Sequence, residues 1–349
     1  MTASPQDALA RRFERFARLE CHGSSPLYER LSLGIAADPD LLALAARARA
    51  GQPTPNLFVG AVHALLLGGV QHPLARFYPS LTPDPDREGD PYPSFRNFCL
   101  DHAEQIRALI ATRLVQTNEV RRCALLLPAF AVVAQRTEDR PPAVVEVGAS
   151  AGLNLLWDRY TYDYGDGAVA GDPFSPVRIT CAVRGPHRPP VPVVMPRVVA
   201  RIGIDLNPID VRDADAVAWL RALIWPEHSE RATLLAQAIA MVQAEPPSLI
   251  AGDALAVLPG VLDGVPEDAA LCVVHTHTLN QFSSEAWERF TALIDAYGAR
   301  RDLYRISIAD LFGEGDDPLL GLVTYENGVK QEQVLAACDA HGRWIAWRG

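Results

Sequence analysis

An acidic residue and two glycines follow a short run of β-favouring residues, in the order Glu146, Gly148 and Gly152. The apolar run before Glu146 and the helical pattern after Gly152 predict a buried strand that turns sharply into a helix. Glycine lets the backbone approach a ligand without an intervening Cβ, and free N–H groups at a helix start favour polar or anionic ligand groups. An ordinary strand-to-helix corner also favours glycine, so the pattern leaves both roles open.

The spacing of this turn distinguishes among nucleotide-binding loops. A P-loop requires a lysine after its second glycine, and none follows here, while a dinucleotide-binding loop reads G-x-G-x-x-G. This turn reads E-x-G-x-x-x-G and resembles the first motif of class I S-adenosylmethionine-dependent methyltransferases. The resemblance implies an open α/β sheet, S-adenosylmethionine as cofactor, and cofactor contacts from Glu146, Gly148, Ala149, Ser150, Gly152 and Asn154.

Two later strands are expected to end in acidic residues. The segment 201–208 predicts a strand ending at Asp205, followed by Asn207, and the segment 248–254 predicts one ending in Gly252 and Asp253. A carboxylate at the first position accepts bonds from ribose hydroxyls in nucleotide-binding sheets. The methyltransferase resemblance implies that Asp253 holds the adenine amino group. Each aspartate could instead cap a helix, because aspartate is favoured at that position on physical grounds alone.

The ribose acid usually lies about 20 residues beyond the first glycine motif, whereas Asp205 lies much further from Glu146. The residues 160–198 between them combine short β-favouring runs with a proline-rich tract. We therefore expect a β-rich insertion here, with a domain linker as the alternative.

Over nearly its full length, the chain is similar to a bacterial family with a domain of unknown function and a methyltransferase-like core. The similarity rests on four segments, 116–120, 146–160, 203–208 and 219–228. It implies the fold, because that family carries no settled reaction.

Acid–base chemistry is expected where the fourth strand ends, at His275, His277 and Asn280. Ligands of open α/β sheets bind beyond the carboxyl ends of the strands, and a neutral imidazole can act as a general base near physiological pH. We expect no metal, because no carboxylate or cysteine pattern completes a ligand set. Histidines that are hydrogen-bonded in a strand-end network are the alternative.

The polar run 116–119 precedes an apolar helix. Thr117 or Asn118 could cap that helix. Alternatively, the run faces the cofactor, with Asn118 and Asn280 binding the acceptor and Glu119 binding an acceptor amine or taking its proton.

Composition narrows the class of protein. The 349 residues exceed the usual size of one core and are 49% hydrophobic, so two domains are expected. The net charge of −10 disfavours nucleic acid as a partner. The six cysteines are scattered, and the most apolar tract, 57–70, is interrupted by His63 and too short to span a bilayer. We therefore expect a cytoplasmic protein that acts on a small molecule, without membrane partners.

The fold class expected is α/β, a Rossmann-like class I methyltransferase sheet with antiparallel terminal strands. We expect residues 1–136 to form a helical cap or lid and residues 137–349 to form the α/β domain. Strands are predicted near 143–147, 200–205, 248–252, 270–276 and 302–308. Asn327-Gly328 between two β-favouring runs predicts a terminal hairpin.

The leading functional hypothesis is methyl transfer from S-adenosylmethionine to an oxygen or nitrogen of a small molecule. The alternative is a non-catalytic module that binds S-adenosylmethionine or a related nucleoside. An NAD-dependent oxidoreductase is disfavoured by the glycine spacing.

Overall fold

The computed structural model describes residues 4–348 with the exception of 117, 139, 166, 168 and 310–316. Its chain forms two compact units, one from Met1–Thr117 with Arg212–Thr233 and the other from Asn118–Val211 with Leu234–Gly349. This division differs from the expected boundary at residue 136. The helix that ends at Arg136 packs on the α/β unit, and the segment 212–233 returns to the helical unit.

The helical unit begins with helices whose starts are encoded by a polar cap followed by proline. The side chains of Ser4, Ser25 and Asp38 accept backbone N–H bonds at the starts of three helices, each with proline in the first turn. The elements of this unit are α1 (Pro5–Arg15), η1 (Phe16–Cys21), α2 (Pro26–Ala36), α3 (Pro39–Ala45), α4 (Thr54–Leu67), η2 (Pro73–Phe77), α5 (Tyr92–Asp101), α6 (Ala103–Thr112) and α8 (Ala214–Ala222).

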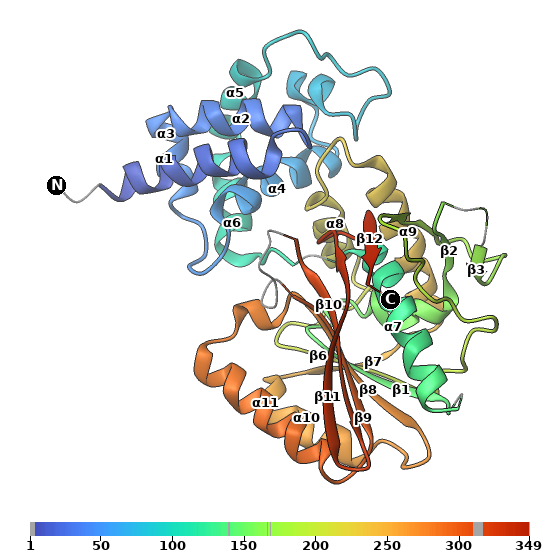
Figure 1. Ribbon diagram of the computed structural model, residues 1–349. Coiled ribbons are helices and arrows are strands. Elements are labelled where there is room, and N and C mark those ends of the chain that lie inside the picture. Colours follow the sequence, from blue (N-terminus) through green and yellow to red (C-terminus); the bar gives the residue numbers. More distant parts are fainter. Residues whose placement is uncertain are drawn as a thin grey trace. The chain divides into compact units, whose positions relative to one another are not determined.

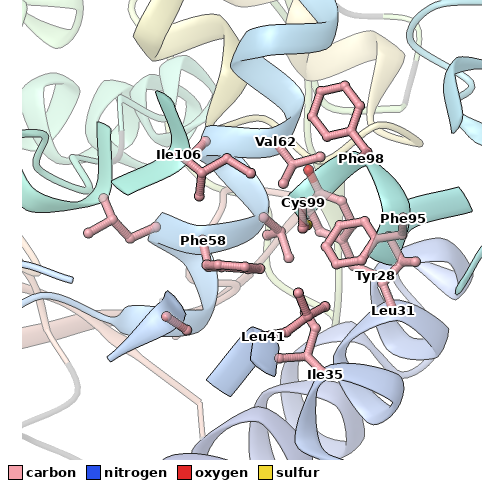
Figure 2. Close-up of a cluster of buried hydrophobic side chains, with 14 of the residues drawn as sticks. Tyr28, Leu31, Ile35, Leu41, Phe58, Val62, Phe95, Phe98, Cys99 and Ile106 are labelled. Atoms are coloured by element: carbon pink, nitrogen blue, oxygen red, sulfur yellow. The ribbon is translucent and has the colours of Figure 1, made fainter. Parts of the chain in front are cut away.

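The core of this unit is built from several of these helices. Figure 2 shows Phe58 and Val62 of α4 together with Phe95 and Phe98 of α5, all of which are buried. The late helix α8 belongs to the same core, because Trp219 packs in it and donates from Nε1 to the carbonyl oxygen of Leu114 at 2.8 Å.

The described residues of the α/β unit form a large, mostly parallel sheet of nine strands in the order β5-β12-β11-β10-β9-β8-β1-β6-β7 (Figure 1). The strands of this sheet are β1 (Pro142–Val147), β5 (Ala182–Val183), β6 (Ala200–Asp205), β7 (Ser248–Ala251), β8 (Ala270–Thr276), β9 (Leu303–Ala309), β10 (Leu319–Glu326), β11 (Val329–Cys338) and β12 (Trp344–Trp347). The five strands predicted from sequence are therefore present, each within one residue of its predicted bounds.

The strand order reverses at β1, which pairs in parallel with β6 on one side and β8 on the other. In this register Glu146 lies opposite Gly203 of β6 and Val274 of β8. The carboxyl ends of β1, β6 and β8 consequently meet at one edge of the sheet. Such a reversal is where ligands bind in open α/β sheets.

Helices cover both faces of this sheet. On one face, α10 (Ala254–Asp263) and α11 (Ser284–Gly298) pack against a core that includes Val145, Val147 and Val273 (Figure 1). Side chains alternate along a strand, so Glu146 points to the opposite face. The helix α7 (Cys123–Arg136) covers that face, where Phe130 stacks on Trp157 at 4.0 Å between ring centroids.

The terminal hairpin of the large sheet and the insertion are two further β-regions of this unit. Asn327 and Gly328 have φ angles of 52° and 76° and form the turn between β10 and β11, which confirms the predicted hairpin. The insertion contains a three-stranded sheet of β2 (Thr161–Asp163), β3 (Val169–Gly171) and β4 (Arg178–Thr180).

The other elements are η3 (Val120–Arg122), η4 (Leu153–Arg159), α9 (Ser229–Ala244) and η5 (Leu279–Gln281). Within the described part of the chain, no helix combines the length and apolar character needed to cross a membrane.

Candidate functional site

The turn after β1 adopts a left-handed backbone at three positions, with φ angles of 80° at Gly148, 50° at Ser150 and 72° at Gly152. The N–H of Gly148 donates to the carbonyl oxygen of Ile204 at 2.8 Å, which holds the turn against β6. A Cβ on Gly148 would collide with the side chain of Thr278, and one on Gly152 would lie 2.8 Å from Pro247. Close packing of the chain itself therefore requires both glycines.

Asp205 ties this turn to the ends of the neighbouring strands. Its Oδ2 accepts the backbone N–H of Ser150 at 2.8 Å, and its Oδ1 accepts that of Asn207 at 2.8 Å. The N–H of Gly252, just after β7, donates to the Asp205 carbonyl oxygen at 2.9 Å. The structure thus brings together Asp205, Asn207, Gly252 and the glycine turn.

Asn118 also binds the glycine turn, through its side-chain amide. Its Nδ2 donates to Ser150 Oγ at 2.7 Å, and its Oδ1 accepts the Ala151 N–H at 3.0 Å. The neighbouring Glu119 is buried and caps η3 through a bond from the Arg121 N–H to its Oε1, at 3.2 Å. Asn118 therefore contacts the glycine turn rather than capping a helix, whereas Thr117 lies outside the described residues.

Glu146 is only 2% exposed at the carboxyl end of β1. Its Oε1 accepts a bond from Asn154 Nδ2 at 2.9 Å, while its Oε2 is buried without a hydrogen-bond partner among the described residues. Burial raises the pKa of Glu146 to about 8, although the bond from Asn154 and the charge of Arg122 act in the opposite direction. At neutral pH this carboxyl group is therefore mostly protonated and has an O–H to donate.

Arg122 brings a positive charge to this face of the sheet. Its Nη1 donates to Thr276 Oγ1 at 3.4 Å, and its Nε donates to the Ala340 carbonyl oxygen at 2.9 Å. Sequence reasoning missed Arg122. The available signal was its position three residues after the polar run 116–119, which the sequence offered as a segment that faces the cofactor.

A second interaction that the sequence did not reveal joins β6 to η4, the segment that follows the glycine turn. Arg201 of β6 forms a two-pronged ion pair with Asp158 of η4, at 2.6 and 2.7 Å, and also donates to the Leu155 carbonyl oxygen. The two side chains are 10% and 4% exposed. Arg201 is thus largely buried within a strand of the main sheet.

The histidines at the end of β8 have different environments. His275 is fully buried, lies 5.8 Å from Phe290 of α11 between ring centroids, and belongs to the face opposite Glu146. Burial lowers the pKa of His275 to about 3, so the ring is neutral. His277 is half-buried with a φ of 57°, and its N–H donates to Ile308 at 2.8 Å.

Two predicted ligands lie at the surface. Asp253 is exposed and caps α10, accepting the Leu255 N–H at 3.0 Å, which matches the capping alternative. Asn280 is exposed in η5. The adenine and acceptor contacts of these two residues stay predictions.

A family model described as "Uncharacterized protein conserved in bacteria (DUF2332)" matches residues 10–347. The chain belongs to this family. The match covers nearly the whole chain and confirms the bacterial family inferred from sequence. No curated protein and no solved structure matched the chain.

Proposed function

We propose that the α/β unit is a Rossmann-like methyltransferase, which transfers the methyl group of S-adenosylmethionine to an oxygen or nitrogen of a small molecule. The observation that carries this proposal is the meeting of Glu146, Ser150 and Asp205 at the edge where the strand order reverses. A nucleoside bound at such a reversal meets a carboxylate and a glycine turn from adjacent strands. That combination favours an adenosine-containing cofactor.

The residues of this edge fit the cofactor's groups. Each Asp205 oxygen accepts one backbone N–H, which leaves further acceptor capacity for ribose hydroxyls. The protonated Glu146 has a buried Oε2 without a partner among the described residues, so it has a hydrogen-bond donor to offer a bound group. Asn118 fixes the turn through Ser150 and Ala151. These residues are proposed to hold and orient the nucleoside.

The bound cofactor would supply an electrophilic methyl group, and the chain would contribute mainly orientation and exclusion of water. A base is needed only for an acceptor that arrives protonated. Glu119 adjoins Asn118, and His277 adjoins Thr278, whose side chain abuts Gly148. We propose these two residues for proton removal, because His275 lies in the core of the other face.

Isothermal titration calorimetry with S-adenosylmethionine, S-adenosylhomocysteine and NAD tests the cofactor. We expect the first two to bind. Asp205→Ala should weaken their affinity roughly 5- to 150-fold, which corresponds to about 1 to 3 kcal/mol for an unmet hydrogen-bond partner. Asp163→Ala, in the central strand of the small sheet, is the matched control and should bind like the parent. Binding of NAD alone, or equal binding by Asp205→Ala, would overturn the proposal.

A non-catalytic nucleoside-binding module is the second candidate. It is favoured by the positions of two residues predicted to serve the acceptor, because His275 is buried on the other face of the sheet and Asn280 is exposed in η5. A screen of small alcohols, carboxylates and amines for release of S-adenosylhomocysteine separates the two. Cofactor binding without release for any acceptor class would favour the module.

A further inference from the structure

A buried arginine lies on the face of the sheet opposite Glu146. Arg305, in β9, is 3% exposed, and neither its Nε nor its Nη1 has a hydrogen-bond partner among the described residues. The acids whose charge acts on it are already engaged, because Lys330 pairs with Asp295 at 3.1 Å and with Glu332 at 3.0 Å. The guanidinium group is therefore buried with two donor nitrogens, Nε and Nη1, that have no hydrogen-bond partner in the described part of the chain.

A second polar group without partners lies on the neighbouring strand. His275 of β8 is fully buried, and neither ring nitrogen has a hydrogen-bond partner among the described residues. In the strand register, His275 lies opposite Ser307, and Ser307 lies opposite Gly321 of β10. Arg305 and Ser307 are two residues apart and share this face. A histidine, a serine and a glycine thus form one row across three strands beside Arg305.

Aromatic residues of α11 lie over these groups. The Arg305 guanidinium carbon is 5.9 Å from the centre of the Trp287 ring. The ring centroids of His275 and Phe290 are 5.8 Å apart, and the two rings are nearly perpendicular. Trp287 is half-buried, so it connects this group of residues to the surface. The small residues Ser307 and Gly321 continue the row from His275 across β9 and β10.

Buried polar groups without partners are rare, because each loses its hydrogen bonds to water on folding. A guanidinium group presents its donors in a fork that matches the two oxygens of a carboxylate or phosphate. A neutral imidazole adds one N–H donor, and serine adds a hydroxyl donor. All three therefore suit the same ligand chemistry.

We propose that Arg305, His275 and Ser307 bind an oxyanion, the phosphate or carboxylate group of a small molecule. This site lies on the α11 face of the sheet and is independent of the methyltransferase proposal. A phosphate group and a carboxylate group belong to different classes of small molecule, and the titration described next distinguishes them.

Inorganic phosphate and acetate are titrated into the full chain at one ionic strength held with sodium chloride, and thermal unfolding and tryptophan fluorescence are recorded. We expect one or both oxyanions to raise the unfolding temperature and to change the fluorescence of Trp287, a change that Trp287→Phe removes. A response to phosphate alone identifies a phosphoryl ligand, and a response to acetate alone identifies a carboxylate ligand. No response of the parent to either would overturn the site.

Arg305→Met should reduce the affinity for the responding anion at least tenfold, and Ser307→Ala should reduce it less. Arg178→Met is the matched control, since this exposed arginine pairs with Asp163 in the small sheet, and it should respond like the parent. In chloride alone, Arg305→Met should unfold at no lower a temperature than the parent, because it removes a buried charged group whose Nε and Nη1 have no hydrogen-bond partner among the described residues. Arg305→Lys keeps the charge but loses the forked pair of donors. Its affinity for the anion should therefore lie between those of the parent and Arg305→Met. An unchanged anion response in both Arg305 variants would contradict the assignment.

Discussion

Glu146 and His275 belong to adjacent strands, yet their side chains leave opposite faces of the sheet. His275 lies opposite Val147 in the register of β1 and β8, so the side chain of Glu146 takes the other direction. Glu146 meets the polar groups of Asn154 and Arg122, whereas His275 meets Phe290 and Arg305. One short stretch of parallel sheet therefore separates two buried groups, each of which has an unmet hydrogen-bonding atom among the described residues.

The first prediction concerns Glu146, whose pKa rises from 4.5 to about 8 through burial. A carboxyl group with a higher pKa in the folded chain binds its proton more tightly when folded. Its contribution to the free energy of unfolding is therefore fully present below pH 4.5 and is lost as pH rises toward 8. Glu146→Gln cannot ionise and should lack this loss, which amounts to about 1.4 kcal/mol per pKa unit.

Urea unfolding of both proteins across this pH range measures the difference. Glu267→Gln, at an exposed loop acid, is the control and should keep the pH dependence of the parent. A Glu146→Gln variant with the parental slope would show that Glu146 is ionised in the folded chain.

The second prediction concerns Gly148, which has a φ of 80° and abuts Thr278. Gly148→Val should lower the free energy of unfolding by roughly 2 to 4 kcal/mol, because a left-handed backbone and an overpacked contact are both unfavourable for valine. Gly260→Ala is the contrast, since this helical glycine of α10 has open space and the change should stabilise by about 1 kcal/mol. Parental stability of Gly148→Val would mean that the turn has room for a side chain.

The third prediction concerns the buried pair of Arg201 and Asp158. Arg201→Met should cost about 3 to 5 kcal/mol, because it leaves Asp158 buried without its partner. The double variant Arg201→Met/Asp158→Leu should recover much of this loss, since no buried charge remains. The exposed pair of Arg178 and Asp163 should contribute less than about 1 kcal/mol in the same double-mutant cycle. Additive effects at the buried pair would contradict a direct interaction.

The fourth prediction rests on the proposed function and separates cofactor binding from turnover. Glu119→Gln and His277→Ala should retain affinity for S-adenosylmethionine, and at least one should slow methyl transfer by about 100-fold if a base is used. His187→Ala, in the exposed part of the insertion, is the control. Rates are compared with an acceptor found in the screen. If both variants turn over like the control, the reaction needs no base from these residues.

The sequence predicted the parallel strands well because each is a short apolar run bounded by turn residues. The run before Glu146 and the run before Asp205 both became buried or partly buried strands, and Asn327-Gly328 became the expected turn. These features depend on neighbours in the chain, which a sequence displays directly.

The contacts of the candidate site could be predicted only in part. The end of each strand could be located, but the register between β1 and β8 depends on packing of the whole sheet, so the opposite directions of Glu146 and His275 were not foreseen. The bonds from Asn118 to the turn and from Arg122 to Thr276 join residues far apart in sequence. No local pattern encodes such pairs.

The helical unit draws its core from two separate stretches of chain, because Trp219 and Ala222 of α8 pack with residues of the first 117. During synthesis, that core stays incomplete until residue 222 has left the ribosome. By then β1 and β6, which belong to the other unit, have already been made. The helical unit therefore cannot be completed before part of the α/β unit has been made, and the growing chain must hold an incomplete helical core while the first strands of the sheet emerge.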